Sequence, residues 1–535
     1  MNNSGIYRHL KTTVRKNKSI VYFITILLLS TLISNCKEQQ NNPNKNIQLS
    51  QFDELKDQTL SLDISKMRQQ CRHLAINDND STQTDHITRK LYKSEFTPVW
   101  VNRYGVDSCA DTLLAYLKTV NQIGFSEKAF FTSKIEKDLK RLRLLDFGDQ
   151  DINTIAARLE YHLTKAFLRY CTGQRFGFTN PYSSLNHLDP IADDSTVRIK
   201  EYRHLFDIPI ERPDKAFYSD ALRNVVKCKT AEFLHSVQPD NTTLEELRQM
   251  LNTVADSKKK RRILCNMERH RWRRTPLATS DLGRKVVVNI PAFTLYAYSP
   301  DSVMTMKIGC GSTKTKTPLL TSQISRMDIN PQWNIPMSII KKDVAKHAGN
   351  SHYFDSHRYF IVERETGKRI DPSSVTTEML KSGKYRVTQE GGKGNSLGRI
   401  IFRFNNNFSV YLHDTSNRKF FSQAVRSVSH GCIRVEKPFE LAQFLLNDNV
   451  DEWTLDKIRI SMDMTPQTDK GIRYVSDTTR SRKLINSKSL QPNIPLYIIY
   501  QTMSKTSRGN WETYPDIYGF DAVTSRQLAP FLDDK

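Results

Sequence analysis

The chain has 535 residues, enough for about two to four ordinary domains, and its composition excludes a multi-span membrane protein. Hydrophobic residues make up 38% of it and aromatic residues 10%, as is typical of a globular protein with a polar surface. The formal net charge of +23 predicts anionic partners.

The N-terminal segment has the pattern of an export signal. Cations without any acidic residue precede an apolar run at 20–33; they are Arg8, Lys11, Arg15, Lys16 and Lys18. The run is shorter than the roughly 20 residues of a spanning helix and fits a signal-peptide core of about 7 to 15. The segment 32–36, Leu-Ile-Ser-Asn-Cys, resembles a lipoprotein cleavage box. We therefore expect an exported protein on the periplasmic side of a bacterial membrane, lipid-anchored at Cys36, with an uncleaved anchor or ordinary signal cleavage as the alternatives.

The positive charge is spread over the chain and not confined to this leader, because the charge without the five leader cations is still +18. Nucleic acid is the usual partner of so basic a protein, but an exported one meets wall polymers, anionic glycans or lipid headgroups. A basic run at 258–262, continued by Arg269, Arg271, Arg273 and Arg274, is interpreted as a solvated helical face. No nucleic-acid partner is expected.

The cysteines are too widely scattered to predict a metal site. They lie at positions 36, 71, 109, 171, 228, 265, 310 and 432, without a CxxC pair or zinc-like spacing. We expect neither a metal nor another cofactor. Apart from Cys36 and Cys432, the cysteines either form disulfides in an oxidising compartment or are buried free thiols, and the sequence assigns no connectivity.

A half with helical spacing precedes a half with strand spacing. Segments 112–117 and 159–168 repeat apolar residues at steps of three and four, which indicates helices. The period changes near residue 283, where 285–290 and 294–298 are typical of two strands. Further strand candidates lie at 359–362, 400–404 and 408–412. The predicted fold class is α+β.

The predicted organisation has five parts and one insertion. The parts are a leader at 1–36, a flexible polar tether at 37–60, a mainly helical scaffold domain at 61–275, a β-rich domain at 276–470, and a C-terminal extension at 471–535 that packs on either domain. The insertion, at about 337–392 in the β-rich domain, is either a lid or an ordinary excursion. No internal repeat is present in the sequence.

The segment Ser429-His430-Gly431-Cys432-Ile433-Arg434 predicts an exposed, sharply turned cysteine. Acyl transfer by cysteine needs a thiolate, a proton acceptor and N–H donors for the oxyanion. Glycine lets backbone amides approach that oxyanion closely. Cys432 is therefore the candidate nucleophile, and the amides of Gly431 and Cys432 are candidate oxyanion donors.

His413 is the better of two candidate bases for Cys432. It follows the strand candidate 408–412, so its imidazole can face a neighbouring loop. His430 lies only two residues from Cys432, which suits a residue that shapes the turn. A lone cysteine or histidine is usually an ordinary buried residue, but together with an export signal and a β-rich context the pair predicts catalysis.

These residues resemble the YkuD-like L,D-transpeptidases, whose signature is a histidine followed by Ser/Thr-His-Gly-Cys and arginine. Further segments resemble the large YcbB-type subgroup: 288–293, 317–318, 330–336, 395–398 and 411–415, with 98–101 upstream and 516–519 near the C-terminus. The peptidoglycan-binding repeat that many of that subgroup carry is not recognisable between 130 and 260, so the sequence leaves open whether a separate wall-binding module is present.

The resemblance implies an enzyme that acts on peptidoglycan stem peptides and forms 3-3 cross-links. Cys432 would form a thioester with a donor tetrapeptide and release D-alanine, with His413 as proton acceptor and donor. Ser429, His430 and Arg434 would support the site, Arg434 through turn carbonyls or, alternatively, a substrate carboxylate. Tyr411 and Trp333 are expected to be packing residues. The rival hypotheses are an L,D-carboxypeptidase or protein-to-wall attaching enzyme with the same nucleophile, and a non-catalytic wall-binding lipoprotein.

Overall fold

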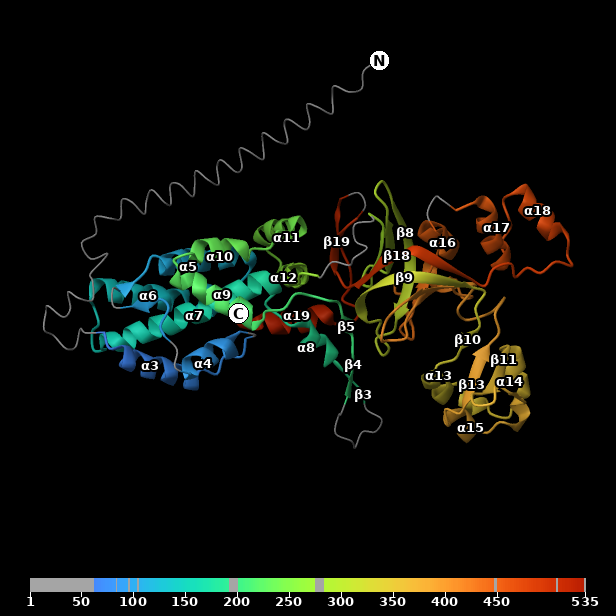
Figure 1. Cartoon of the computed structure of the whole chain (residues 1–535), viewed down its shortest axis with the longest axis horizontal. Helices are drawn as coiled ribbons and strands as arrows, with labels where there is room; N and C mark the ends of the chain where they lie inside the picture. The colour runs from blue at the N-terminus through green and yellow to red at the C-terminus, as the bar shows by residue number, and fades with distance from the viewer. Residues whose placement is uncertain are drawn as a thin grey trace, which may run out of the picture. The chain divides into compact units, whose positions relative to one another are not determined.

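The computed structural model describes residues 62–82, 84–94, 97–102, 105–191, 201–274, 283–446, 450–506 and 509–533 (Figure 1). The expected leader, the lipid-anchor residue Cys36 and the tether at 37–60 lie outside these residues. Among the described residues, no helix combines the length and the apolar character needed to cross a membrane. The chain divides into two compact units that each combine separate stretches of sequence. The first holds residues up to 174, 213–238 and 530–535, and the second holds 175–212 and 239–529.

The first unit is helical and is organised around α7 (Ile152–Phe176), which is buried along most of its length. Figure 1 shows the other helices of this unit around it. They are α3 (Ile64–Asn77), α4 (Asp85–Lys93), α5 (Cys109–Leu117), α6 (Thr132–Leu144), α9 (Lys215–Val226) and α10 (Thr230–Ser236), with a small ribbon of β1 (Val101–Asn102) and β2 (Gly105–Val106). The helical patterns at 112–117 and 159–168 are confirmed in α5 and α7.

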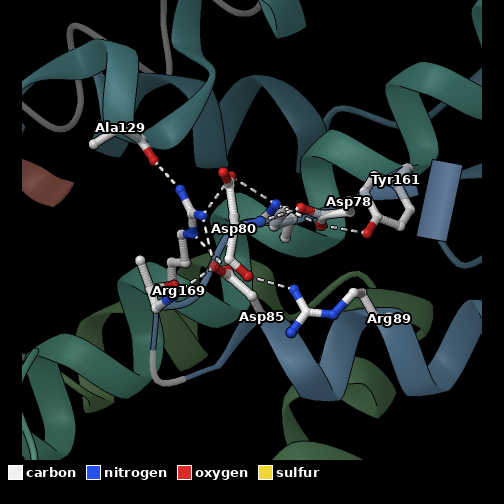
Figure 2. A network of polar contacts seen from close by, with 9 residues as sticks. Asp78, Asp80, Asp85, Arg89, Ala129, Tyr161 and Arg169 are labelled. Carbon is white, nitrogen blue, oxygen red and sulfur yellow. Dashed lines mark hydrogen bonds and ion pairs between the residues drawn. The ribbon is translucent and has the colours of Figure 1, made fainter. Parts of the chain in front are cut away.

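Charged side chains of α7 are buried in a network that opposite charges neutralise (Figure 2). Lys165 pairs with Asp78 at 2.5 Å and with Asp80 at 2.8 Å. Arg169 pairs with Asp80 at 2.9 Å and with Asp85 at 2.7 Å. Burial opposes ionisation of Asp78, but hydrogen bonds from Lys165 and Tyr161 lower its pKa overall. The network thus compensates the cost of burying charge inside a helical bundle.

The second unit is built on one sheet that closes on itself. Its strand order is β14-β15-β17-β8-β7-β6-β18-β9-β5, and β14 also pairs with β9. The strands are β5 (Phe206–Asp207), β6 (Lys285–Asn289), β7 (Thr294–Tyr298), β8 (Val303–Gly311), β9 (Leu319–Ile329), β14 (Ile400–Phe404), β15 (Leu412–His413), β16 (Ser427–Ser429), β17 (Ile433–Val435) and β18 (Ser487–Ile499). Alternate residues of these strands fill one large hydrophobic core.

Helices and short ribbons accompany the sheet in this unit. They are α8 (Pro181–Asn186), α11 (Thr242–Thr253), α12 (Ser257–Arg271), α16 (Pro438–Leu446), α17 (Glu452–Ser461), α18 (Asp469–Ser476) and α19 (Phe520–Leu528), and the pairs β3 (Asp189–Ile191) with β4 (Glu201–Arg203) and β19 (Met503–Lys505) with β20 (Trp511–Thr513). The strand patterns at 285–290, 294–298 and 400–404 are confirmed. The α+β fold class is confirmed as well.

The insertion forms a small lobe with its own sheet and core (Figure 1). Its strand order is β10-β13-β11-β12. The elements are β10 (Trp333–Asn334), α13 (Met337–Lys342), α14 (Ser351–Ser356), β11 (Tyr359–Glu363), β12 (Arg369–Ile370), α15 (Thr377–Lys381) and β13 (Tyr385–Gln389). Because β10 pairs with β13, the lobe begins a few residues before the expected start at 337. Whether it moves as a lid stays a prediction.

The compact units divide the chain differently from the expected boundary at 275. Helices α11 and α12 belong with the sheet, where Asn266 of α12 hydrogen-bonds to Thr502 at 2.8 Å. The C-terminal extension is no appendage, since β18 lies inside the main sheet between β6 and β9. Strand β18 runs parallel to β6 and antiparallel to β9. The spatial neighbours of these segments are far away in sequence, which a local pattern does not reveal.

Two further expectations are wrong in part. The basic run was expected to be solvated throughout, and Lys258, Lys259 and Lys260 are exposed. However, Arg269 is buried beside Asp521 at 2.6 Å, and Arg271 is buried over the ring of Phe178. The second is the strand at 408–412, of which only β15 at 412–413 is regular. Asn406 replaces the missing strand pairing there, because its side chain bonds to the backbone of Phe408 and Val410.

Candidate active site

Two short parallel strands bring the predicted catalytic residues to one face of the sheet. In the pairing of β15 with β17, Leu412 lies opposite Ile433 and His413 lies opposite Arg434. Leu412 and Ile433 are fully buried in the core. Because side chains alternate along a strand, Tyr411, His413, Cys432 and Arg434 all project from the other face. These four side chains therefore form one patch.

The turn before Cys432 is closed by Ser429. The Ser429 hydroxyl donates to the carbonyl of Cys432 at 2.5 Å and accepts from the amide of Gly431 at 3.1 Å. Gly431 has φ +123°, a conformation that other residues rarely adopt. The amide of Gly431, expected as an oxyanion donor, is already engaged within the turn.

The amide of Cys432 is the better oxyanion donor in this geometry. Within the described part of the chain, it makes no hydrogen bond, whereas the next amide, of Ile433, is bound to the carbonyl of Tyr411 at 3.0 Å. A free N–H beside a nucleophilic sulfur can donate to the oxygen of a tetrahedral intermediate.

A loop at 311–317 holds the turn through hydrogen bonds. Thr317 donates from its hydroxyl to the carbonyl of Gly431 at 2.8 Å and accepts from the amide of Gly311 at 2.8 Å. Tyr518 donates to the carbonyl of Gly311 at 2.6 Å and accepts from the amide of Thr317 at 3.1 Å. Thr315 donates to the carbonyl of Ser429 at 2.9 Å. The turn is therefore held by residues from β8, the following loop and the C-terminal region.

His413 is buried, with 4% of its surface exposed, and its Nδ1 has no hydrogen-bond partner among the described residues. Burial, reinforced by the positive charge of Arg434, lowers its pKa to about 4. Contacts with the backbone of Asp414 and Leu397 act in the opposite direction. The imidazole is therefore neutral at neutral pH, the form that can accept a proton.

Cys432 is partly buried, and burial raises the pKa of its thiol. Hydrogen bonds from the backbone and the side chain of Tyr411 and the charges of Arg434 and Arg403 oppose this rise. No hydrogen bond joins Cys432 to His413 in the described structure, although both project from the same face. The thiol of Cys432 therefore keeps its proton until a base removes it, and it does not react as a preformed thiolate.

The remaining predicted residues take different positions. His430 is exposed to solvent. Arg434 makes no hydrogen bond to the turn carbonyls among the described residues; its guanidinium lies 5.5 Å from the centre of the Phe420 ring and its Nε has no partner. The turn carbonyls instead accept from the hydroxyls of Thr315, Thr317 and Ser429. Arg426 donates to carbonyls outside the turn, those of Ile308, Phe293 and Gln423.

Tyr411 was expected to be a packing residue, but it contacts the reactive group directly. Its side chain hydrogen-bonds with Cys432 and with Trp333 of the insertion lobe, and Arg403 lies over its ring at 5.2 Å. Its place next to His413 in the sequence was the available signal, because neighbours at i and i+2 share one face of a strand. Segments 317–318 and 516–519, which hold Thr317 and Tyr518, carried the family resemblance, but their long-range contacts could not be predicted from them. Arg426 had no such signal, and its partner Ile308 lies more than a hundred residues away.

Comparison with known proteins agrees with this geometry. Residues 283–460, which contain the turn and both candidate catalytic residues, match the family YkuD, the L,D-transpeptidase catalytic domain. Residues 86–251 match a scaffold domain. The strand-rich part of the chain is therefore similar to the L,D-transpeptidase catalytic domain of the YkuD family. The separate scaffold domain agrees with the expected YcbB-type subgroup of that family.

A curated protein similar to this chain comes from Haemophilus influenzae and is named "Putative L,D-transpeptidase". The two chains are 28% identical over 318 residues, which are 58% of this chain and 59% of the relative. The described cysteines of the chain, from Cys71 to Cys432, are all free thiols in the structure, and most of them are buried.

Proposed function

We propose that the protein is a peptidoglycan L,D-transpeptidase that forms 3-3 cross-links through a thioester on Cys432. The observation that carries this proposal is the single face of β15 and β17 with Cys432, His413 and Arg434, inside a YkuD catalytic domain. The substrates are stem peptides of the wall, one as acyl donor and one as amine acceptor.

In the first half-reaction, the sulfur of Cys432 attacks the carbonyl carbon of the donor peptide's third residue. A C–S bond forms, the C–N bond to the terminal D-alanine breaks, and D-alanine leaves as a free amine. His413 takes the thiol proton and passes it to the leaving nitrogen. In the second half-reaction, a side-chain amine of another stem attacks the thioester and regenerates the thiol.

The charges of the site support this sequence of steps. The lowered pKa of His413 keeps the base neutral, and the raised pKa of Cys432 makes a base necessary. The amide of Cys432 is the oxyanion donor, an interaction typically worth about 2.7–4 kcal/mol. Arg403 and Arg434 stabilise the negative charge that develops as the proton leaves, and they suit a substrate with free carboxylates.

We also propose that the enzyme works outside the cytoplasm, tethered by a lipid at Cys36. The sequence pattern of the leader and the polar segment at 37–60 support this location. A Cys36→Ser variant should lose metabolic labelling by a palmitate analogue, and retained labelling would end the proposal of a lipid at this position.

Incubation with purified tetrapeptide muropeptides tests the reaction. The expected products are dimers with 3-3 links and free D-alanine, and a Cys432→Ala variant should form neither. Tripeptide and D-alanine without dimers would replace the transpeptidase with an L,D-carboxypeptidase. Undiminished cross-linking by Cys432→Ala, or failure of a carbapenem to acylate the wild type, would contradict a cysteine mechanism.

A further inference from the structure

Two cysteines and an aspartate from distant parts of the chain meet on the helical unit. Ligand atoms of Asp107, Cys109 and Cys228 all lie within 4.8 Å of one another. The Cys228 thiol donates to Oδ2 of Asp107 at 2.9 Å, and Cys109 lies within hydrogen-bonding reach of Cys228. Asp107 and Cys228 are exposed while Cys109 is buried, so the group opens to solvent on one side.

One of the three residues begins a helix, and the other two lie directly beside helix ends. Cys109 is the first residue of α5, and Asp107 accepts hydrogen bonds from the amides of Ser108 and Cys109. Cys228 lies in the tight connection between α9 and α10, and α10 packs against α5. The three ligand atoms therefore converge from two helix ends that tertiary packing brings together.

The backbone at Cys228 is in a conformation that glycine normally supplies. Cys228 has φ +55°, and its amide and that of Lys229 bond back to the carbonyls of Val225 and Asn224. This arrangement ends a helix with a left-handed residue, where a side chain is unfavourable. Cysteine is less favourable than glycine in this left-handed backbone conformation, but here it directs a thiol to Asp107.

We propose that Asp107, Cys109 and Cys228 bind a thiophilic divalent cation of the Zn²⁺ class. Thiolates and a carboxylate are ligands of Zn²⁺, and Zn–S bonds of about 2.3 Å in a tetrahedron place ligand atoms roughly 3.5 Å apart, within the spacing found. The open side admits a water as fourth ligand. Binding forms three metal–ligand bonds and releases the two thiol protons to solvent.

The bound cation would cross-link two segments of the helical unit. Three anionic ligands and a dication leave one negative charge, and the exposed Lys227 and Lys229 lie on either side of Cys228. The cation joins the start of α5 to the α9–α10 connection, and this cross-link does not depend on the chemistry at Cys432. The sequence predicted no metal, because ligand-spacing rules search short segments and not residues 109 and 228 together.

Zinc uptake by the full chain tests the proposal. The Cys432→Ala background is used so that the partly buried catalytic thiol is not a competing ligand. Reduced protein is incubated with Zn²⁺, separated from free metal and analysed for bound zinc. We expect one zinc per chain, a thiolate-to-metal absorption band with Co²⁺, and a melting temperature higher by roughly 5–10 °C at free Zn²⁺ a hundred times Kd.

Cys228→Gly in the same background is the decisive variant. Glycine suits the left-handed backbone, so the metal-free variant should melt at the same temperature or higher, yet it should lose the bound zinc and the melting shift. Asp107→Asn should weaken zinc binding at least tenfold. The control Cys71→Ala, which removes a buried thiol elsewhere in this unit, should keep full stoichiometry.

Unchanged zinc in Cys228→Gly, or no zinc in the reduced parent protein, would overturn the proposal. A Cys109–Cys228 disulfide in protein purified without reductant, combined with no zinc uptake after reduction, would replace the cation site with a redox pair. Zinc that binds only to protein with an intact Cys432 would assign the metal to the catalytic thiol instead.

Discussion

Buried charged groups are paired in the network of the helical unit, whereas buried polar atoms on the catalytic face lack partners in the described structure. In the network of Figure 2, Arg169 is 4% exposed in its side chain and contacts two carboxylates. On the catalytic face, Nδ1 of His413 and Nε of Arg434 are buried without a partner in the described structure. Buried polar groups are normally hydrogen-bonded, so these exceptions need an explanation.

The difference separates stability from reactivity. A fully paired network favours one packing of the helices, because every alternative leaves a charge without a partner. A catalytic group must instead keep a free position for the proton or charge that appears during the reaction. Substitutions in the two regions should therefore change different measurements, folding in one and turnover in the other.

The largest effect is expected at His413. His413→Gln should slow acylation of Cys432 about 10²- to 10⁴-fold, the usual contribution of a general base, because the amide accepts no proton. Pre-steady-state acylation by a carbapenem measures this rate, and circular dichroism checks that folding is unchanged. His430→Ala, which alters an exposed side chain, should cost much less, and the reverse ranking would exchange the two roles.

The next effect is expected at Arg169 of the network. Arg169→Met should lower the free energy of unfolding by about 3–5 kcal/mol, because Asp85 is left buried without its cation. Urea unfolding followed by fluorescence measures the change. The matched control is Arg143→Met, whose ion pair with Asp111 is partly exposed and should be worth about 1 kcal/mol or less. Equal losses in both variants would contradict the importance of burial.

Acidification should reveal His413 in a stability measurement. The folded pKa of about 4 lies below the ordinary 6.5, so between these values the unfolded chain binds more protons. This contribution to stability is complete above about pH 6.5 and is lost as the pH falls to about 4. It amounts to roughly 3 kcal/mol. His413→Gln should lose correspondingly less stability over this window, and parallel curves for the two proteins would argue against a neutral buried imidazole.

The smallest effect is expected at Tyr411. Tyr411→Phe removes the phenol that bonds to the thiol but keeps the ring, so the pKa of Cys432 should rise. A hydrogen bond of about 1 kcal/mol corresponds to roughly fivefold slower alkylation of Cys432 at constant pH. The pH profile of alkylation by iodoacetamide measures this, with no loss of thermal stability expected. An unchanged profile would return Tyr411 to a packing role.

The same contrast explains what the sequence could predict. Periodicity located the strands at 285–290 and 294–298 and the helices at 112–117 and 159–168, because each depends on its own residues. The residues at 429–432 predicted an exposed, sharply turned cysteine, because glycine beside cysteine is a local signal. The turn is present, but Cys432 is partly buried. The prediction failed for Arg271, whose partner Phe178 is remote, and none was made for Arg426, which donates to the distant carbonyl of Phe293.

Spatial convergence defines the rest and leaves no local pattern. Arg169 and Asp85 are 84 positions apart, and Thr317 and Gly431 are 114 apart. A charged residue in a helix resembles a surface residue until its partner is known. The network, the support of the turn and the cation ligands therefore emerge only from tertiary structure.

The position of β18 has a consequence for how the molecule is made. This strand, at 487–499, fills the gap between β6 and β9, strands that are synthesised long before it. Until it emerges from the ribosome, β6 and β9 each keep an unpaired edge, which invites association with other chains. Premature termination between residues 433 and 486 should thus yield an aggregation-prone product that contains Cys432 and His413 but lacks one strand of the sheet that holds them.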